Sequence, residues 1–104
     1  MEPFPIFDVD DDSLCCPRCG FFYLHQTAVE VWNRKEDEDV GGIRITQEGN
    51  VAEATGDNPS ARRSGVSIAF ECEECPCNAE LVIFQHKGQT FIEWREAHRA
   101  IPTV

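Results

Sequence analysis

The sequence predicts a mainly β protein, a small antiparallel sheet of about five strands held together by a metal site of four cysteines. Short segments in which β-branched and aromatic residues alternate with polar ones indicate the strands, and turn residues separate these segments. No segment carries the periodicity of a long helix. The 104 residues allow one small domain, whose apolar core alone is marginal, so a staple is expected.

Two strands are predicted in the first half of the chain, behind an acidic start. Residues 1–14 hold five acidic and no basic side chains, and two prolines there favour extended backbone. Residues 21–34 predict the first strand. One face of that strand is expected to carry alternate residues, namely Phe21, Tyr23, His25, Thr27, Val29 and Val31. The charged run 35–39 predicts a solvated turn, and a short strand is expected over 43–47.

A polar loop and a half-buried strand come next. Residues 48–64 are rich in Gly, Asn, Ala, Asp and Ser, which predicts a loop. Within it, residues 58–63 predict one helical turn, with Asn58 as its N-cap and Gly65 ending it. Residues 66–71 alternate apolar and polar side chains and therefore predict the third strand.

A hairpin closes the predicted sheet. Its two strands cover residues 80–86 and 90–96, and Lys87–Gly88 between them is a strong signal for a tight turn. Ile92 and Trp94 are two residues apart in the second strand, so we expect them to share a face.

The chain divides into an acidic N-terminal segment (1–14), a single β domain (15–97) and a tail (98–104). Its first residues lack the basic and apolar regions of a secretory signal, and no apolar run approaches the roughly 18 residues of a membrane span. A cytoplasmic location is therefore expected. In a reducing cytoplasm, clustered cysteines favour metal ligation over disulfides.

The charge balance is strongly acidic. Nine Lys and Arg against nineteen Asp and Glu give a formal net charge of −10. Nucleic-acid binding draws on concentrated Lys and Arg, so the balance disfavours a nucleic-acid partner. It also argues against binding to an anionic membrane surface.

Two Cys-x-x-Cys pairs carry the clearest chemical signal in the sequence. They consist of Cys16 with Cys19 and of Cys72 with Cys75. Each pair can point two sulfur atoms into one site, and two pairs supply the tetrahedral four-cysteine set that Zn²⁺ prefers. Four cysteines leave no open position for water, so the predicted zinc is structural. The 52 residues between Cys19 and Cys72 require a sheet that brings the two pairs together.

Two cysteines, Cys15 and Cys77, lie outside these pairs and are expected to be structural or incidental. Cys15 could replace Cys16, although Cys16 has the better spacing to Cys19. Three disulfides and an iron ion in the same four-cysteine set remain as alternatives.

Other polar residues give weaker signals, and none predicts a catalytic site. His25 and His86 have no nucleophile or metal motif beside them, so they are expected to be structural or surface residues. Arg62 and Arg63 could bind a phosphate or an acidic partner, and Lys87 is expected in the hairpin turn. The acidic run Asp10, Asp11 and Asp12 lacks the spacing of a calcium loop but could contribute to partner binding.

The Cys-Pro-x-Cys-Gly knuckle and its partner resemble the zinc-ribbon superfamily. The chain is most similar to a group of short uncharacterised bacterial and phage proteins, over about residues 14–96. The matching segments are Cys16–Gly20, Asn58–Gly65, Cys72–Cys75 and Gln85–Thr90. The resemblance implies a zinc-ribbon fold, bound zinc and an origin in a phage or mobile element, and it implies no catalytic residues.

These features predict a non-enzymatic, zinc-stabilised protein that binds a protein partner. Arg62, Arg63, Lys87 and the three aspartates at 10–12 are the candidate contact residues. One alternative is an acidic mimic of nucleic acid that inhibits a host enzyme, such as a defence nuclease or RNA polymerase, in the host cytoplasm. A second is a zinc ribbon that binds nucleic acid directly, should its basic residues lie on one face.

Overall fold

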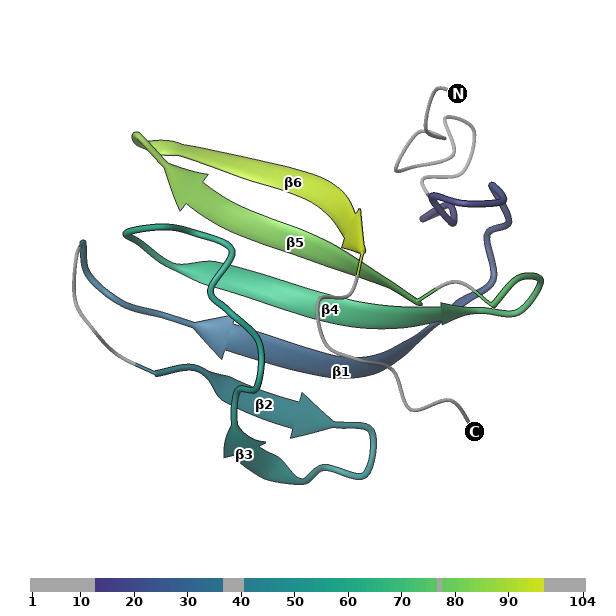
Figure 1. Cartoon of the computed structure of the whole chain (residues 1–104), viewed down its shortest axis with the longest axis horizontal. Coiled ribbons are helices and arrows are strands. Elements are labelled where there is room, and N and C mark those ends of the chain that lie inside the picture. Colours follow the sequence, from purple (N-terminus) through teal and green to yellow (C-terminus); the bar gives the residue numbers. More distant parts are fainter. Residues whose placement is uncertain (1–12, 37–40, 77, 97–104) are drawn as a thin grey trace.

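The computed structural model describes residues 13–36, 41–76 and 78–96, and they form one six-stranded antiparallel sheet (Figure 1). Its strands are β1 (Leu24–Trp32), β2 (Ile43–Thr46), β3 (Val51–Glu53), β4 (Gly65–Cys72), β5 (Asn78–His86) and β6 (Gln89–Glu96). The order across the sheet is β3-β2-β1-β4-β5-β6. The predicted fold class is confirmed, with one strand more than expected.

The additional strand is β3, which lies inside the predicted loop 48–64. It has three residues, all exposed, and pairs with β2 through Ile45 and Val51, Arg44 and Ala52, and Ile43 and Glu53. An edge strand this short has no hydrophobic periodicity of its own. Its pairing with β2 therefore defines it as a strand.

The helical turn predicted over residues 58–63 is wrong, because that segment is a series of bends. The expected cap does form locally: the backbone N–H of Ser60 donates to Asn58 Oδ1 at 3.0 Å. The hydroxyl of Ser60 then accepts the N–H of Arg63 at 2.9 Å and donates to the carbonyl of Gln85 at 2.7 Å. Contacts with distant β5 thus replace the hydrogen bonds within a helix.

The predicted facing of the first strand is also wrong at its start. A register irregularity between Gln26 and Ala28 inserts one residue opposite β4. Such a bulge reverses the alternation of side chains on one side of it. Leu24 pairs with Cys72 and therefore shares a face with Val29, whereas His25 lies on the opposite face.

One face of the sheet, which we call the apolar face, carries two continuous rows of side chains. Paired residues point to the same side, so the register fixes the rows. The first row crosses all six strands as Val51, Ile45, Val29, Ile68, Leu81 and Trp94. The second row consists of Ile43, Val31, Val66, Ile83 and Ile92. Ile92 and Trp94 share this face as predicted.

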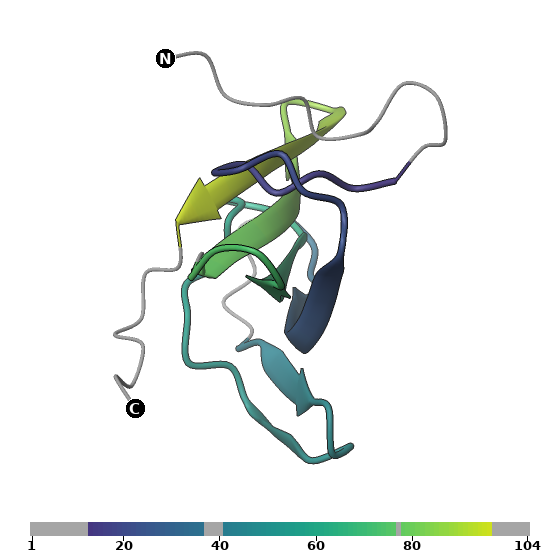
Figure 2. The same cartoon turned by 90° about the vertical axis from the view of Figure 1, so that its right-hand side faces the viewer.

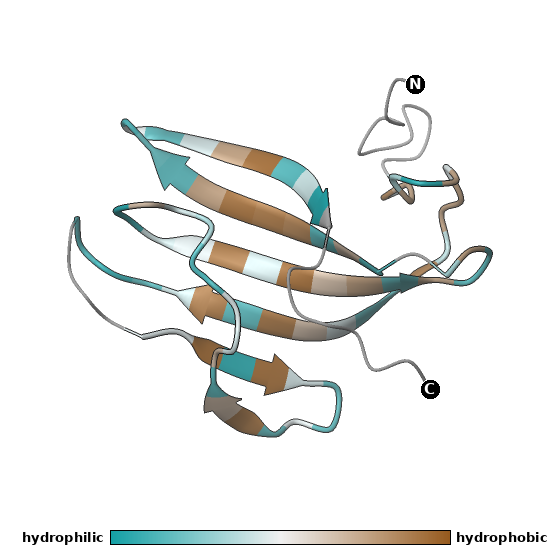
Figure 3. Ribbon diagram, viewed as in Figure 1, coloured by the Kyte–Doolittle hydropathy of each residue, from teal (hydrophilic) through white to brown (hydrophobic). Residues whose placement is uncertain are grey.

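The opposite face, which we call the polar face, carries Glu30, Arg44, Ser67 and Glu80, together with a few large apolar side chains, namely Trp32, Val82, Phe84 and Phe91. Apolar and polar residues accordingly alternate along the strands (Figure 3). The β3–β4 loop crosses this face in front of β1 and β2 and lies to one side of the sheet in the turned view (Figures 1 and 2). Glu30, only 1% exposed, anchors the loop by accepting the backbone N–H of Thr55 at 2.7 Å and that of Gly56 at 3.3 Å. Trp32 and Ser60 are buried here as well.

Candidate metal centre

The first Cys-x-x-Cys pair lies in a tight knuckle before β1. The backbone N–H of Gly20 donates to the Cys16 carbonyl at 2.9 Å, and the Cys16 N–H donates to Phe21 at 2.7 Å. Gly20 has a φ of 80°, a conformation that favours glycine. The N–H of Arg18 points at Cys16 Sγ, 3.4 Å away. The knuckle therefore turns backbone donors toward the sulfur.

The second pair lies where β4 turns into β5. Cys72 is the last residue of β4 and is paired with Leu24, the first residue of β1. The N–H of Glu73 donates to the carbonyl of Tyr23 at 3.2 Å and ties this turn to the first knuckle. Because β1 and β4 are neighbouring strands, the two knuckles lie side by side, although 52 residues separate Cys19 from Cys72 in the sequence.

The four predicted cysteine sulfurs converge at this end of the sheet. Cys16 Sγ lies 3.7 Å from Cys75 Sγ, and Cys19 Sγ lies 3.6 Å from Cys72 Sγ. All four sulfurs lie within 4.8 Å of one another. Four thiolates about 2.3 Å from a tetrahedral ion would be separated by about 3.8 Å. The cluster therefore has the size and donor set to hold a metal ion.

The thiols influence one another's ionisation. Burial raises the pKa of Cys16, but the N–H groups of Cys19 and Arg18 and the nearby thiols outweigh it and lower that pKa from 9.0 to about 7. Burial and the neighbouring sulfurs of Cys19, Cys16 and Cys72 raise the pKa of Cys75. Each thiolate in the cluster disfavours the ionisation of the next thiol. A divalent cation bound among the sulfurs would remove this repulsion.

The remaining cysteines are not part of this cluster where the structure describes them. Cys15 is buried, and its sulfur lies 3.8 Å from the carbonyl of Ser13. No disulfide joins Cys15 or the four clustered cysteines to one another. The sulfur separations in the cluster far exceed the roughly 2.05 Å of a disulfide. Cys77 lies outside the described residues.

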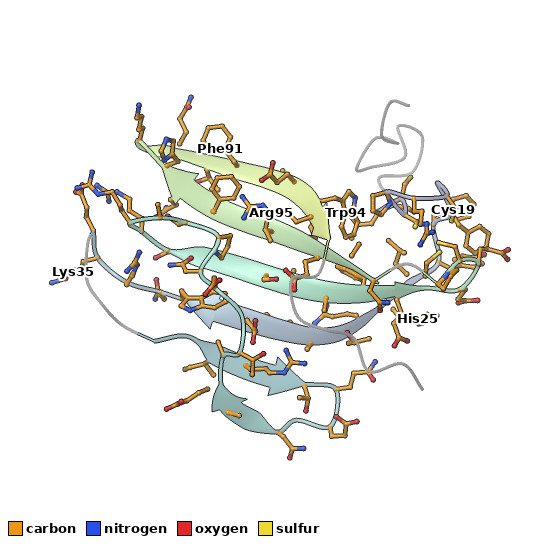
Figure 4. The ribbon with its side chains drawn as sticks, viewed as in Figure 1. Cys19, His25, Lys35, Phe91, Trp94 and Arg95 are labelled. Carbon is orange, nitrogen blue, oxygen red and sulfur yellow. The ribbon has the colours of Figure 1, made fainter. Side chains whose placement is uncertain are left out.

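The other predicted contact residues lie elsewhere. His25 is exposed near the metal centre and lies 2.6 Å from Glu73. Arg62, Arg63 and Lys87 instead meet in a pocket at the β5–β6 turn, together with His86. Figure 4 places Lys35 at one end of the molecule and Cys19 at the other. The three aspartates at 10–12 lie outside the described residues.

Two carboxylates with structural partners were missed by the sequence reasoning. Glu36, assigned to a solvated turn, pairs with Arg62 at 3.2 Å and with Arg63 at 2.8 Å. Glu30, in the first strand, is buried and lies 3.5 Å from Arg44. Both sets of partners are remote in sequence, so no local pattern signals them.

Comparison with protein-family models, with curated proteins and with solved structures gave no match. The zinc-ribbon resemblance and the origin in a phage or mobile element stay predictions. No helix that is long and apolar enough to cross a membrane occurs in the described part of the chain.

Proposed function

We propose that this protein is a non-enzymatic, zinc-stabilised binding module that holds a partner protein on its apolar face. The observation that carries the proposal is the exposure of this face. Val51 is 68% exposed, Ile43 50% and Ile92 40%, although all three belong to the two apolar rows. Large apolar side chains gathered on one sheet face mark an interaction surface, whereas single exposed ones do not.

The size of the apolar face agrees with a binding role. Six strands about 4.8 Å apart, carrying two rows about 7 Å apart, span roughly 350 Å², which is an upper bound on the exposed patch because Leu81 in the first row is only 4% exposed. That falls within the roughly 300–600 Å² of the largest patch on a typical monomer, which is often functional. Two copies face to face would bury roughly 700 Å², well short of the about 1,200 Å² of a stable interface.

The charge of the chain favours a basic partner over a second copy. Two copies would each bring a net charge of −10 to the same interface and repel each other. A protein with an apolar patch and a basic rim would instead be attracted and would add contacts around the edge. A partner whose basic surface otherwise holds nucleic acid is one special case of this proposal.

Zinc is the ion that best fits the four-cysteine cluster, and its proposed role is structural. Cys16, Cys19, Cys72 and Cys75 would fill all four positions of a tetrahedral Zn²⁺, which leaves none for a reacting water. The ion would clamp the chain before β1 to the β4–β5 turn. This closed coordination supports a binding function over hydrolytic catalysis.

Two neighbouring residues of β6 give a matched test of the docking face. Ile92 and Phe91 are both 40% exposed, but they lie on opposite faces of the sheet. The zinc-loaded protein is used to capture partners from a cell extract, and the affinity of a purified, identified partner is then measured by calorimetry. We expect a basic protein, with binding at least about tenfold weaker for Ile92→Ser and unchanged for Phe91→Ser. Val51→Ser, on edge strand β3, repeats the test with little effect on the core.

Three outcomes would overturn the proposal. Equal losses of partner affinity in Ile92→Ser and Phe91→Ser would show that the partner does not bind specifically to the apolar face. A dimeric mass in light scattering that Ile92→Ser makes monomeric would assign the face to a second copy. Deletion of residues 1–12 could increase the binding of a dye specific for apolar surfaces, and Ile92→Ser could reverse that increase. This result would show that the N-terminal segment of the same chain, rather than a partner, occupies the apolar face.

A further inference from the structure

A second candidate site lies at the opposite end of the sheet from the cysteines. The β3–β4 loop meets the β5–β6 turn there and encloses a pocket of about 210 Å³. Its lining includes Arg62, Arg63, His86 and Lys87 together with Glu36. Two segments more than twenty residues apart in sequence thus bring four nitrogen-bearing side chains to one cavity.

The backbone that carries the two arginines is firmly held. The guanidinium group of Arg34 donates to the carbonyl oxygens of Ala61 and Arg63, each at 3.0 Å. The Asn58 side chain donates to the same Arg63 carbonyl at 2.8 Å, and the buried Ser60 hydroxyl fastens the loop to Gln85. With its carbonyls engaged in this way, the loop has a defined position from which both arginine side chains reach Glu36.

The hairpin supplies the other half of the pocket through a turn of fixed shape. Lys87 has a φ of 51° and Gly88 a φ of 79°, as required at the two central positions of a type I′ turn. His86 ends β5 and Gln89 begins β6, so the turn contains only these two residues. This half of the pocket therefore has little conformational freedom.

Glu36 shows which kind of group the two arginines can hold. One of its carboxylate oxygens lies 3.2 Å from Arg62 and the other 2.8 Å from Arg63. Guanidinium groups donate paired N–H bonds to the oxygen atoms of carboxylates and phosphates alike, which makes arginine the usual partner of both anions in proteins. Arg62, Arg63 and Lys87 carry three formal positive charges against the one negative charge of Glu36. The net charge of +2 can neutralise a second, doubly charged anion.

We infer that this pocket binds the phosphomonoester group of a small molecule. A phosphomonoester carries a charge of about −1.5 to −2 at neutral pH and offers three acceptor oxygens to these donors. The pocket is smaller than the about 300 Å³ at which sites for whole drug-sized ligands begin. It therefore suits the phosphate end of a ligand whose remainder lies outside.

The distribution of charge favours a small ligand over a nucleic-acid strand. Binding along a strand needs several phosphate contacts spread over a surface. Of the five other described cations, Arg44 lies against buried Glu30 and Arg95 lies between Glu93 and the ring of Phe84. Arg34 is engaged by loop carbonyls, and Arg18 lies in the cysteine knuckle at the far end, so Lys35 is the one further described cation at this end of the sheet. The chain as a whole carries a net charge of −10, which would repel the remainder of a polyanion. This inference is independent of partner docking on the apolar face.

The test is an NMR titration of the zinc-loaded full chain with inorganic phosphate, AMP, adenosine and a short oligonucleotide with hydroxyl ends. We expect phosphate and AMP to shift the backbone amides of Lys87 and Gly88 in a saturable way, and adenosine to leave them unchanged. Saturable binding of the oligonucleotide tighter than that of AMP would overturn the inference in favour of a nucleic-acid surface. Shifts by adenosine equal to those by AMP would overturn it as well.

Substitutions locate the site. Arg63→Gln should weaken AMP binding by about tenfold or more, since it removes a charge-assisted contact. Lys87→Asn should also weaken binding; it removes the charge, and Asn tolerates positive φ, so the turn survives. Arg95→Gln, which removes an arginine paired with a different carboxylate, should leave binding unchanged. Glu36→Gln should tighten binding severalfold, because it removes the negative charge beside the bound anion. Equal losses in Arg63→Gln and Arg95→Gln, or weaker binding in Glu36→Gln, would contradict the inference.

Discussion

The buried carboxylate of Glu30 accepts a hydrogen bond of 2.7 Å from the backbone N–H of Thr55. The contact joins β1 to a loop residue 25 positions later in the chain and holds the β3–β4 loop on the polar face. Gly56 and Arg44 donate to the same carboxylate. One acidic side chain thus attaches the loop to the sheet through several hydrogen bonds at once.

Glu30→Gln should destabilise the protein by about 2 kcal/mol. The amide keeps one acceptor oxygen, but its N–H₂ group faces donors, and unpaired buried donors cost about 1–3 kcal/mol. Chemical denaturation measures the change. Glu53→Gln, at an exposed position in β3, is the control and should change stability by less than about 0.5 kcal/mol. Similar midpoints for the two variants would show that Glu30 does not anchor the loop.

Gly65 is required because the β3–β4 loop returns directly over its Cα atom. A Cβ at this position would overlap Asn58 Oδ1 and the ring of Pro59. Gly65→Ala should therefore cost about 1–3 kcal/mol, as expected for overpacking a closed site. Gly41→Ala is the matched control, since a Cβ there meets nothing within 4 Å. Thermal unfolding should separate the two variants by several degrees, and coincident curves would contradict the close approach.

The Ser60 hydroxyl joins the β3–β4 loop to the hairpin. Ser60→Ala would remove its bonds to the Gln85 carbonyl and the Arg63 N–H, and should cost about 1–2 kcal/mol. Hydrogen exchange gives a local readout, because the Arg63 amide should lose protection in this variant. The Gly49 amide, which donates to Thr46 in the β2–β3 turn, should keep its protection. Unchanged exchange at Arg63 would mean that the hydroxyl does not fix the loop.

Local signals in the sequence predicted the parts of the fold that local chemistry decides. Lys87–Gly88 needs positive φ and so specifies a tight turn without help from the rest of the chain. The spacing of Cys16 to Cys19, and of Cys72 to Cys75, likewise forms a knuckle on its own. The meeting of the two knuckles was predictable because a tetrahedral four-cysteine site needs two sulfur atoms from each pair.

Long-range contacts decide the features that the sequence did not reveal. The backbone at β3 becomes a strand only by pairing with β2, and Asn58 caps bends because Ser60 bonds to distant Gln85. The bulge after Gln26 moves His25 to the other face without any local breaker residue. Glu36 finds Arg62 and Arg63 across 26 and 27 residues. None of these partners can be inferred from composition or periodicity within one segment.

Substitutions of the adjacent cysteines Cys15 and Cys16 distinguish a role in metal binding from a role in packing. Cys15 and Cys16 are both buried in the same knuckle, but only Cys16 belongs to the four-sulfur cluster. Purified protein should contain one zinc ion per chain by elemental analysis, and Cys16→Ser should lose that zinc, whereas Cys15→Ser should retain it.

Loss of zinc should also lower the melting temperature sharply, since structural zinc adds directly to the folding free energy of small domains. A chelator should lower the melting temperature of the Cys15→Ser protein and leave that of Cys16→Ser unchanged. Retention of zinc in Cys16→Ser would contradict this ligand assignment. Iron in place of zinc in the purified protein would keep the ligands but overturn the identity of the ion.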